Sequence, residues 1–247
     1  MKKRRKTIYA GNLVKVAEYT PPIPRDTPQQ RAAKHKATTE AQKRLNYRTA
    51  QGKLEVKLAA NFTARDYFCT FTYAPGREPR SRKEANQHKA QYVRKVRAQR
   101  RKRGQVIKWV FSVENKHGEG RYHLHAVISS ADPSLDFDEL RSLWPYGHVE
   151  IARLFDSEHM FNTWLDVARY MTKERPEDGK DCTPVGAQIY SCSRNFTPPR
   201  IETEWIDEGA PLDVPPGAFI IERAEVVNEY SRYRYLKYMT EPLYRKE

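Results

Sequence analysis

The stretch RYHLHAVISS, residues 121–130, alternates in the manner of a β-strand and sets two histidines two positions apart. Successive side chains of a strand point to opposite faces, so His123 and His125 share one face while Leu124 and Ala126 share the other. The stretch therefore predicts a strand with one apolar face, suited to a core, and one face on which two imidazoles converge.

A second strand, IKWVFSVEN at residues 107–115, precedes the first and is separated from it by a short polar loop. If the loop comprises the four residues 117–120, Glu114 lies opposite His123. A loop one residue shorter or longer would turn Glu114 onto the apolar face, where an unpaired carboxylate is costly to bury. We therefore predict a hairpin in which Glu114, His123 and His125 share one face.

Around this hairpin the sequence predicts an α+β fold. The expected architecture is a central antiparallel sheet of about five strands with helices packed on it. Helices are expected over residues 82–103 and 158–174, and a helix broken at Gly52 is expected within residues 29–59. The expected strands are residues 67–73, 107–115, 121–129, 148–153 and 187–192.

The two ends of the chain differ in composition from its middle. The composition predicts a basic, proline-containing N-terminal arm and helix over residues 1–44, the main domain over residues 45–200, and a C-terminal tail over residues 201–247. No run approaches the roughly 20 apolar residues of a membrane span, and no signal peptide is apparent. The cysteines show no C-x-x-C spacing, which argues against a disulfide framework or a cysteine zinc site. We expect a soluble, cytoplasmic protein with no membrane partner.

The charge balance points to a polyanionic partner. Lys and Arg number 45 against 31 Asp and Glu, for a net charge of +14. Nucleic acid is the first candidate, since its phosphates attract such a surface. A basic stretch at the end of the helix expected over 82–103 would contact DNA phosphates through Arg94, Lys95, Arg97, Arg100, Arg101, Lys102 and Arg103.

The polar face of the hairpin offers the donors of a metal site. His123, His125 and Glu114 supply two nitrogens and a carboxylate, and such a mixture suits Mn²⁺ or Mg²⁺, with Zn²⁺ as the alternative. The other interpretation is that the histidines are two half-exposed side chains that bind nothing. A second element is needed to decide between them.

The helix expected over 158–174 supplies that element. Tyr170 falls nearly opposite its apolar stripe, and Lys173 lies on the same polar face. Taken alone, the two could be an ordinary surface pair. The apolar stripe itself comprises Phe161, Trp164, Leu165, Ala168 and Met171.

A strand with H-U-H, where U is hydrophobic, followed by Y-x-x-K on a helix resembles the HUH endonucleases, specifically the rolling-circle replication initiators of plasmids, phages and small single-stranded DNA viruses. DYFCTFTY, residues 66–73, resembles the first motif of that family, and Glu114 sits where many members place a third metal ligand. The resemblance covers roughly residues 45–200. Its details look like replication-associated proteins of bacterial plasmids and phages, and it implies an RRM-like fold. The further matching segments are KLAANFTARDYFCTFTYAPGREP, LWPYGHVEIARL, WLDVARYMTKE and YSCSRNFTPPR.

The resemblance implies a covalent mechanism on single-stranded DNA at a replication origin. A metal held by His123, His125 and Glu114 would bind the scissile phosphate, and Tyr170 would attack it to leave a 5′-phosphotyrosine and a free 3′-OH. Lys173 would assist. No G-x-x-x-x-G-K-[ST] motif occurs, so unwinding would fall to a host helicase and extension to a host polymerase, in the cytoplasm of a bacterial cell.

Two other interpretations stay open. A non-catalytic module that binds single-stranded nucleic acid would explain the charge and the aromatic residues without chemistry. Within the enzymes, a mobilisation relaxase or a transposase would form the same covalent adduct. Near the C-terminus, Tyr235 and Tyr238 flank Lys237, and we interpret them as packing or stacking residues rather than as nucleophiles.

Overall fold

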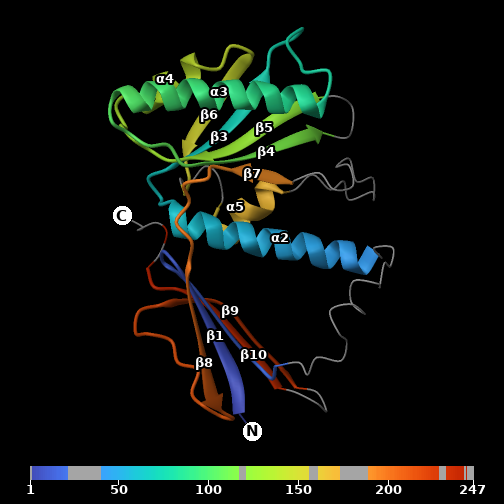
Figure 1. Ribbon diagram of the computed structural model, residues 1–247, viewed down its shortest axis with the longest axis vertical. Coiled ribbons are helices and arrows are strands. Elements are labelled where there is room, and N and C mark those ends of the chain that lie inside the picture. The colour runs from blue at the N-terminus through green and yellow to red at the C-terminus, as the bar shows by residue number, and fades with distance from the viewer. Residues whose placement is uncertain are drawn as a thin grey trace. The chain divides into compact units, whose positions relative to one another are not determined.

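The computed structural model describes residues 2–21, 40–116, 121–155, 161–172, 189–227, 232–241 and 243. The chain divides into two compact units, the first made of Met1–Ala60 and Thr197–Pro242 and the second of Asn61–Phe196 and Leu243–Glu247. Each unit contains its own five-stranded antiparallel sheet (Figure 1).

The sheet of the second unit has the strand order β6-β3-β5-β4-β7. All neighbouring strands are antiparallel, and the hairpin of β4 and β5 lies inside the sheet. This confirms the predicted α+β fold, with each predicted strand present and its ends moved by at most a few residues. The strands are β3 (Tyr67–Tyr73), β4 (Trp109–Lys116), β5 (Arg121–Ile128), β6 (Gly147–Arg153) and β7 (Tyr190–Cys192).

The hairpin has the predicted register. Glu114 pairs with His123 and Lys116 with Arg121. Leu124 and its apolar neighbours on β4 and β5 face the core, so the histidines take the opposite face. Because the apolar sets of both strands match only in this register, burial alone selects it.

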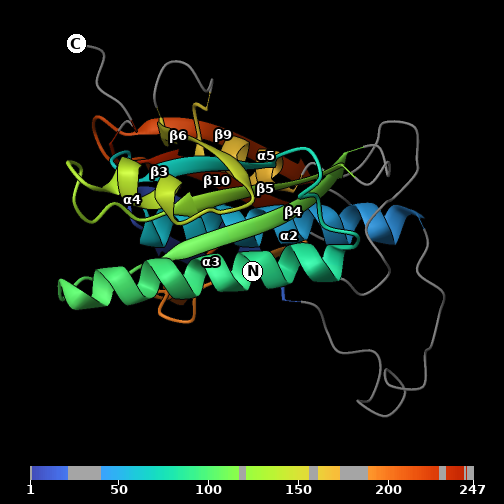
Figure 2. The same cartoon turned by 90° about the horizontal axis from the view of Figure 1, so that it is seen from above.

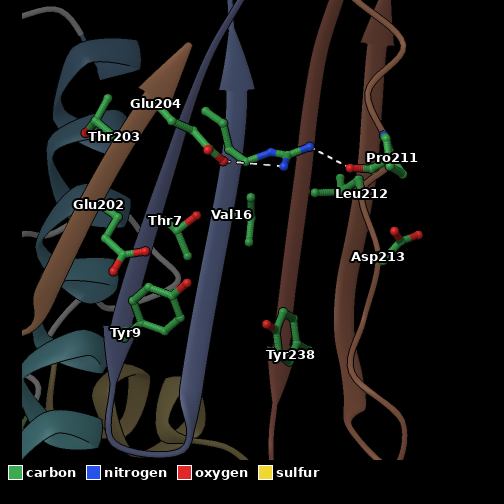
Figure 3. A pocket seen from close by; sticks show the side chains of 11 residues that line it. Thr7, Tyr9, Val16, Glu202, Thr203, Glu204, Pro211, Leu212, Asp213 and Tyr238 are labelled. Atoms are coloured by element: carbon green, nitrogen blue, oxygen red, sulfur yellow. Dashed lines mark hydrogen bonds and ion pairs between the residues drawn. The ribbon is translucent and has the colours of Figure 1, made fainter. Parts of the chain in front are cut away.

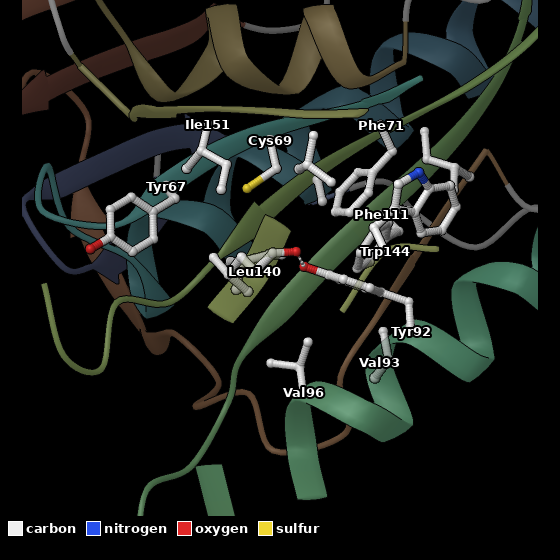
Figure 4. Close-up of a cluster of buried hydrophobic side chains, with 14 of the residues drawn as sticks. Tyr67, Cys69, Phe71, Tyr92, Val93, Val96, Phe111, Leu140, Trp144 and Ile151 are labelled. Atoms are coloured by element: carbon white, nitrogen blue, oxygen red, sulfur yellow. Dashed lines mark hydrogen bonds between the residues drawn. The ribbon is translucent and has the colours of Figure 1, made fainter. Parts of the chain in front are cut away.

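Two helices cover the apolar face: α3 (Arg82–Lys102) and α4 (Asp136–Ser142). Figures 1 and 2 show α3 lying along β4. The ring of Phe71 on β3 packs 4.8 Å from that of Tyr92 on α3 and 5.1 Å from that of Trp144 (Figure 4). The Tyr92 hydroxyl donates to the Leu140 carbonyl at 3.1 Å, which ties the two helices together.

The ends of α3 match its sequence signals. The side chain of Ser81 accepts a hydrogen bond from the backbone N–H of Glu84 at the start of the helix. Gly104, with φ +68°, follows its end, as expected of a residue that adopts the left-handed conformation without strain.

The first unit is built from both ends of the chain. Its sheet has the order β8-β1-β2-β10-β9. The helix α2 (Glu40–Asn61) lies almost wholly within this unit. The strands are β1 (Lys2–Ala10), β2 (Leu13–Tyr19), β8 (Arg200–Asp207), β9 (Phe219–Val227) and β10 (Arg232–Met239).

The structure here differs from the expected arm (1–44) and tail (201–247). Acidic residues from other strands compensate the basic residues of β1, so the charges need no open solvent. Glu18 is completely buried, with its carboxylate 2.7 Å from Nη2 of Arg5 and 2.5 Å from Nη2 of Arg234. These partners are far apart in the sequence, so local patterns indicate only unpaired charge.

Two predicted helices also differ from the structure. Within the described part, α2 continues through Gly52, where a break was expected, and residues 29–39 lie outside that part. The helix expected over 158–174 is α5 (Trp164–Met171), with residues 156–160 and 173–180 outside the described part. In the described ranges, no helix combines the length and apolarity needed to cross a membrane.

Candidate functional site

The face of the second unit's sheet that points away from α3 carries polar side chains in two cross-strand rows. Directly paired residues of antiparallel strands point to the same face, so the pairing defines the rows. One row contains His148, Thr72, His123 and Glu114, and the next contains Glu150, Thr70, His125 and Ser112.

His125 is held at both ring nitrogens. Its Nε2 lies 2.7 Å from Oε2 of Glu114, and its Nδ1 lies 3.3 Å from Oγ1 of Thr70. The side chain is almost fully buried. A neutral imidazole that donates from Nε2 to the carboxylate and accepts the Thr70 hydroxyl at Nδ1 satisfies both contacts at once. The ring is therefore fixed in position and tautomer by residues of two neighbouring strands.

Aromatic side chains bring Tyr170 of α5 to this imidazole. The ring centroid of Tyr170 lies 5.1 Å from that of His125, with an interplanar angle of 80°. The ring of Phe68 stacks 6.0 Å from that of His125 and lies 5.3 Å from that of Tyr170. Phe161 lies 5.6 Å from Tyr170. The predicted juxtaposition of the helix tyrosine and the strand histidine is thus present.

The short helix α5 is fixed by its first turn. The Thr163 side chain accepts from the backbone of Asp166, and the Asp166 side chain accepts from the backbone of Thr163, forming a capping box. Its buried residues are Trp164, Val167, Ala168 and Met171. Val167 replaces Leu165 in the predicted apolar stripe, because the helix is rotated so that Tyr170, itself half-buried, lies against β3 rather than in open solvent.

The donor set of the site fits a divalent ion. His123 is half-buried on the same face as His125, and the Glu114 carboxylate already meets an imidazole nitrogen. The Ser112 hydroxyl, beside His125 in the register, is buried without a hydrogen-bond partner in the described part of the chain. Among the same residues, no three His, Cys, Asp or Glu side chains converge closely enough to form a finished metal site. Ligation by Glu114, His123 and His125 therefore stays a prediction.

The basic residues predicted to contact DNA fall into two groups. Arg100 is completely buried, with Nη2 3.1 Å from Oδ1 of Asp136 and Nη1 donating to the Ser129 carbonyl. Arg103 pairs with Glu139 at 2.5 Å. The expectation for Arg100 is corrected, since a guanidinium that compensates a buried carboxylate cannot reach a phosphate. The exposed members are Arg94, Lys95, Arg97, Arg101 and Lys102.

The remaining predicted residues lie elsewhere. Lys173 is outside the described residues. Lys237 is buried in the first unit, with its Nζ 3.2 Å from Oε1 of Glu55. Burial and the nearby Glu55 raise the pKa of Tyr235. These contacts agree with the interpretation that the tyrosines around Lys237 have a packing role.

Sequence reasoning did not assign Thr70, Phe68 or Phe161 to the site. A usable signal for Thr70 was present, because CTFTY places two threonines at alternate positions of an otherwise apolar strand. No comparable signal marks Phe68 and Phe161, since an aromatic residue in a strand or before a helix normally packs in a core.

A pocket in the first unit has a different character. It has a volume of about 360 Å³ and is lined by Glu202, Glu204 and Asp213, with Arg5 bonded to Glu204 and to the Pro211 carbonyl (Figure 3). Carboxylates repel phosphates, so we do not include this pocket in a nucleic-acid site.

Comparison with known protein families places the histidine face and Tyr170 in one matched segment. Residues 66–175 match the model of the replication-associated protein ORF2 family. This part of the chain is a replication-associated domain of that rolling-circle initiator family. The matched residues of this replication-associated protein run from just before β3 to just beyond α5. Comparisons with curated proteins and with solved structures gave no match.

Proposed function

We propose that this replication-associated protein nicks and rejoins single-stranded DNA at a replication origin, with Tyr170 as the nucleophile. The observation that carries the proposal is the position of the Tyr170 ring, 5.1 Å from a histidine that is itself bonded to Glu114. A phenol next to an imidazole and a carboxylate, on a face lined with further polar residues, has the components of phosphoryl transfer.

The reaction balances as a transesterification. Tyr170 Oη forms a bond to the scissile phosphorus and loses its proton, while the bond from phosphorus to the 3′ oxygen breaks and that oxygen gains a proton. The products are a 5′-phosphotyrosyl strand and a free 3′-OH. Because the phosphodiester energy is kept in the tyrosyl bond, the same site can run the reaction backwards and rejoin the strand.

His123, His125 and Glu114 would hold Mn²⁺ or Mg²⁺, with Zn²⁺ as the alternative, and the bound ion would neutralise charge on the scissile phosphate. Thr70 fixes the orientation of His125, and Phe68 and Phe161 restrict the Tyr170 ring to one side of the imidazole. Lys173 follows α5 in the sequence, and we assign it the role of neutralising the phosphate or assisting ionisation of the phenol.

DNA would be held first by charge. The exposed cations of α3 provide phosphate contacts that carry little sequence information. The 3′-OH released by the nick can prime a host polymerase, and a host helicase would separate the strands. The proposed setting is therefore the cytoplasm of a bacterial cell that carries the replicating element.

The test is formation of a covalent protein–DNA adduct. The protein is incubated with Mn²⁺ and single-stranded oligonucleotides that include the intergenic DNA of its own element, and adducts are resolved on a denaturing gel. We expect an adduct with the wild type and with Tyr122→Phe, whose residue packs against the opposite face, and none with Tyr170→Phe or His123→Ala. Binding without any adduct would overturn the proposal in favour of a non-catalytic binding module.

A mobilisation relaxase or transposase would yield the same adduct. Supercoiled plasmids that carry either the element's replication origin or its transfer region distinguish the roles. Nicking confined to the replication origin, followed by polymerase extension of the 3′ end, is the outcome expected here. Nicking only in the transfer region would identify a relaxase.

A further inference from the structure

A cavity of about 550 Å³ lies at the C-terminal end of α3, in the second unit. It is formed by the last turns of the helix, the start of β4 and the residues that follow β7. Its volume falls in the range of small-molecule sites, which is enough for one nucleotide. No Asp or Glu lines it, in contrast to the acidic pocket of the first unit.

Three guanidinium groups line this cavity: Arg97 and Arg101 from α3, and Arg194 from the segment after β7. All three are exposed, and in the described part of the chain no hydrogen bond or ion pair joins any of them to another residue. Their neighbours Arg100 and Arg103, by contrast, are paired with carboxylates. The guanidiniums at the cavity are therefore available to an anion.

This grouping is unfavourable without a ligand. Arg97 and Arg101 are four residues apart on one helix, where like charges repel. Arg194 adds a third positive charge from a different element. Fold stability does not require such a cluster, because no carboxylate lines the cavity to compensate it. An anionic ligand would remove the repulsion.

The rest of the lining suits a planar apolar group. Val106 is 71% exposed, although it is an aliphatic residue, and Trp109 lies beside it in the cavity wall. The indole Nε1 of Trp109 is buried without a hydrogen-bond partner in the described ranges. Bases stack on aromatic side chains, and phosphates bind arginine, so a nucleotide satisfies both halves of the cavity.

The cavity lies close enough to the histidine face for one DNA strand to use both. Trp109 precedes Glu114 by five positions on β4, a distance of about 17 Å along the strand. Their side chains point to opposite faces of the sheet, so the strand would pass around the edge formed by β7. A nucleotide in the cavity would thus flank the one at the scissile position.

We propose that this cavity binds one nucleotide of single-stranded DNA that flanks the cleavage position, with its phosphate on Arg97, Arg101 and Arg194 and its base beside Trp109. The proposal rests on the function proposed above. It narrows the DNA contact from a diffuse basic helix to a defined subsite.

The test measures binding of a fluorescent oligo-dT to the full chain by anisotropy over a series of salt concentrations. For Arg97→Gln/Arg101→Gln we expect affinity to fall by about tenfold and the slope of log K against log salt to fall by about 1.4, for two lost phosphate contacts. The matched control, Arg80→Gln/Lys83→Gln, removes the same charge at exposed positions near the other end of α3 and should change neither quantity. Equal losses in both double variants would overturn the subsite.

A second variant separates base contact from charge. Trp109→Leu keeps an apolar side chain but removes the stacking surface, so affinity should fall with the salt slope unchanged. Thermal melts of each variant report whether the fold is intact. A free mononucleotide should compete only at far higher concentration than the oligonucleotide, and competition at equal concentrations would indicate a free-nucleotide site instead.

The two proposals fail separately. Tyr170→Phe should retain full oligo-dT affinity, because its residue is outside the cavity. If no adduct ever forms but the cavity variants still bind more weakly than their control, the subsite stands and the nicking function falls. If adducts form and the cavity variants bind normally, the reverse holds.

Discussion

Glu114 is paired in the β-ladder with His123, yet its carboxylate bonds to Nε2 of His125, two positions further along β5, at 2.7 Å. The carboxylate therefore lies beside both imidazoles rather than beside one. This diagonal contact occupies the very atoms that would bind a divalent ion, so it keeps the proposed ligands together on one small area of the sheet.

Replacing Glu114 should therefore weaken metal binding more than DNA binding. For Glu114→Gln we expect the concentration of Mn²⁺ needed for half-maximal adduct formation to rise by about 10-fold or more, since an anionic ligand is lost. Isothermal titration with Mn²⁺ gives an independent readout. Glu150→Gln, an exposed carboxylate on the same face of β6, is the matched control and should behave as wild type. Equal effects of the two variants would contradict the assignment.

The Thr70 hydroxyl should act through His125. Thr70→Val keeps the shape of the side chain but removes the contact at Nδ1, and Mn²⁺ affinity should fall by about tenfold while oligo-dT affinity stays constant. Thr70→Ser should restore most of the metal affinity. Thr72→Val, one row away, serves as the control. A serine variant as impaired as the valine variant would indicate that packing, not the hydroxyl, is important.

Arg100 should be required for stability rather than for DNA binding. Arg100→Met leaves the buried Asp136 carboxylate without its ion-pair partner, which should lower the free energy of unfolding by about 3–5 kcal/mol. Urea denaturation measures this loss. The exposed Arg97→Met should cost less than about 0.5 kcal/mol. A stable Arg100→Met protein with weakened DNA affinity would reverse our correction.

His88 should make the protein more sensitive to acid. Its ring stacks on Tyr146 at 3.8 Å, and burial holds the pKa of His88 below its usual value of 6.5, against a smaller opposing effect of Glu84. The neutral ring is thus favoured in the folded state. The stability it contributes is present above pH 6.5 and is lost as the pH falls through the depressed folded-state pKa.

The comparison variant is His88→Phe, which can stack but does not titrate. Between pH 7.5 and pH 5 the melting temperature of the wild type should fall further than that of His88→Phe, and an NMR titration of the His88 ring should give a midpoint below 6.5. Parallel melting curves across this range would show that the histidine does not couple to folding.

Local patterns were sufficient to predict the part of the fold that carries the site. The β4–β5 hairpin depends on alternation and on one loop length, and both are evident within about 25 residues of sequence. The contact of Tyr170 with His125 required only that a helix cover the polar face. Arg100 could not be assigned this way, because its partner Asp136 lies on another helix and nothing local distinguishes it from its exposed neighbours.

The first unit shows where such reasoning ends. Its basic strand β1 is stabilised by pairing with β8, about two hundred positions away, and Glu18 is compensated by Arg234 from β10. Alternation in KKRRKTIYA is obscured by charge on both faces. Only a partner strand of complementary charge makes this segment a stable part of a sheet, and no local rule identifies that partner.

The interleaving of early and late segments in one sheet also has a consequence for synthesis. The hairpin of β1 and β2 leaves the ribosome before the strands that cover its two edges, β8 and β10, so both edges stay open while the whole replication-associated domain is made. The sheet that starts first is therefore completed last. Translation that stops before β10 would leave an open edge on β2, and such a product should be prone to aggregate.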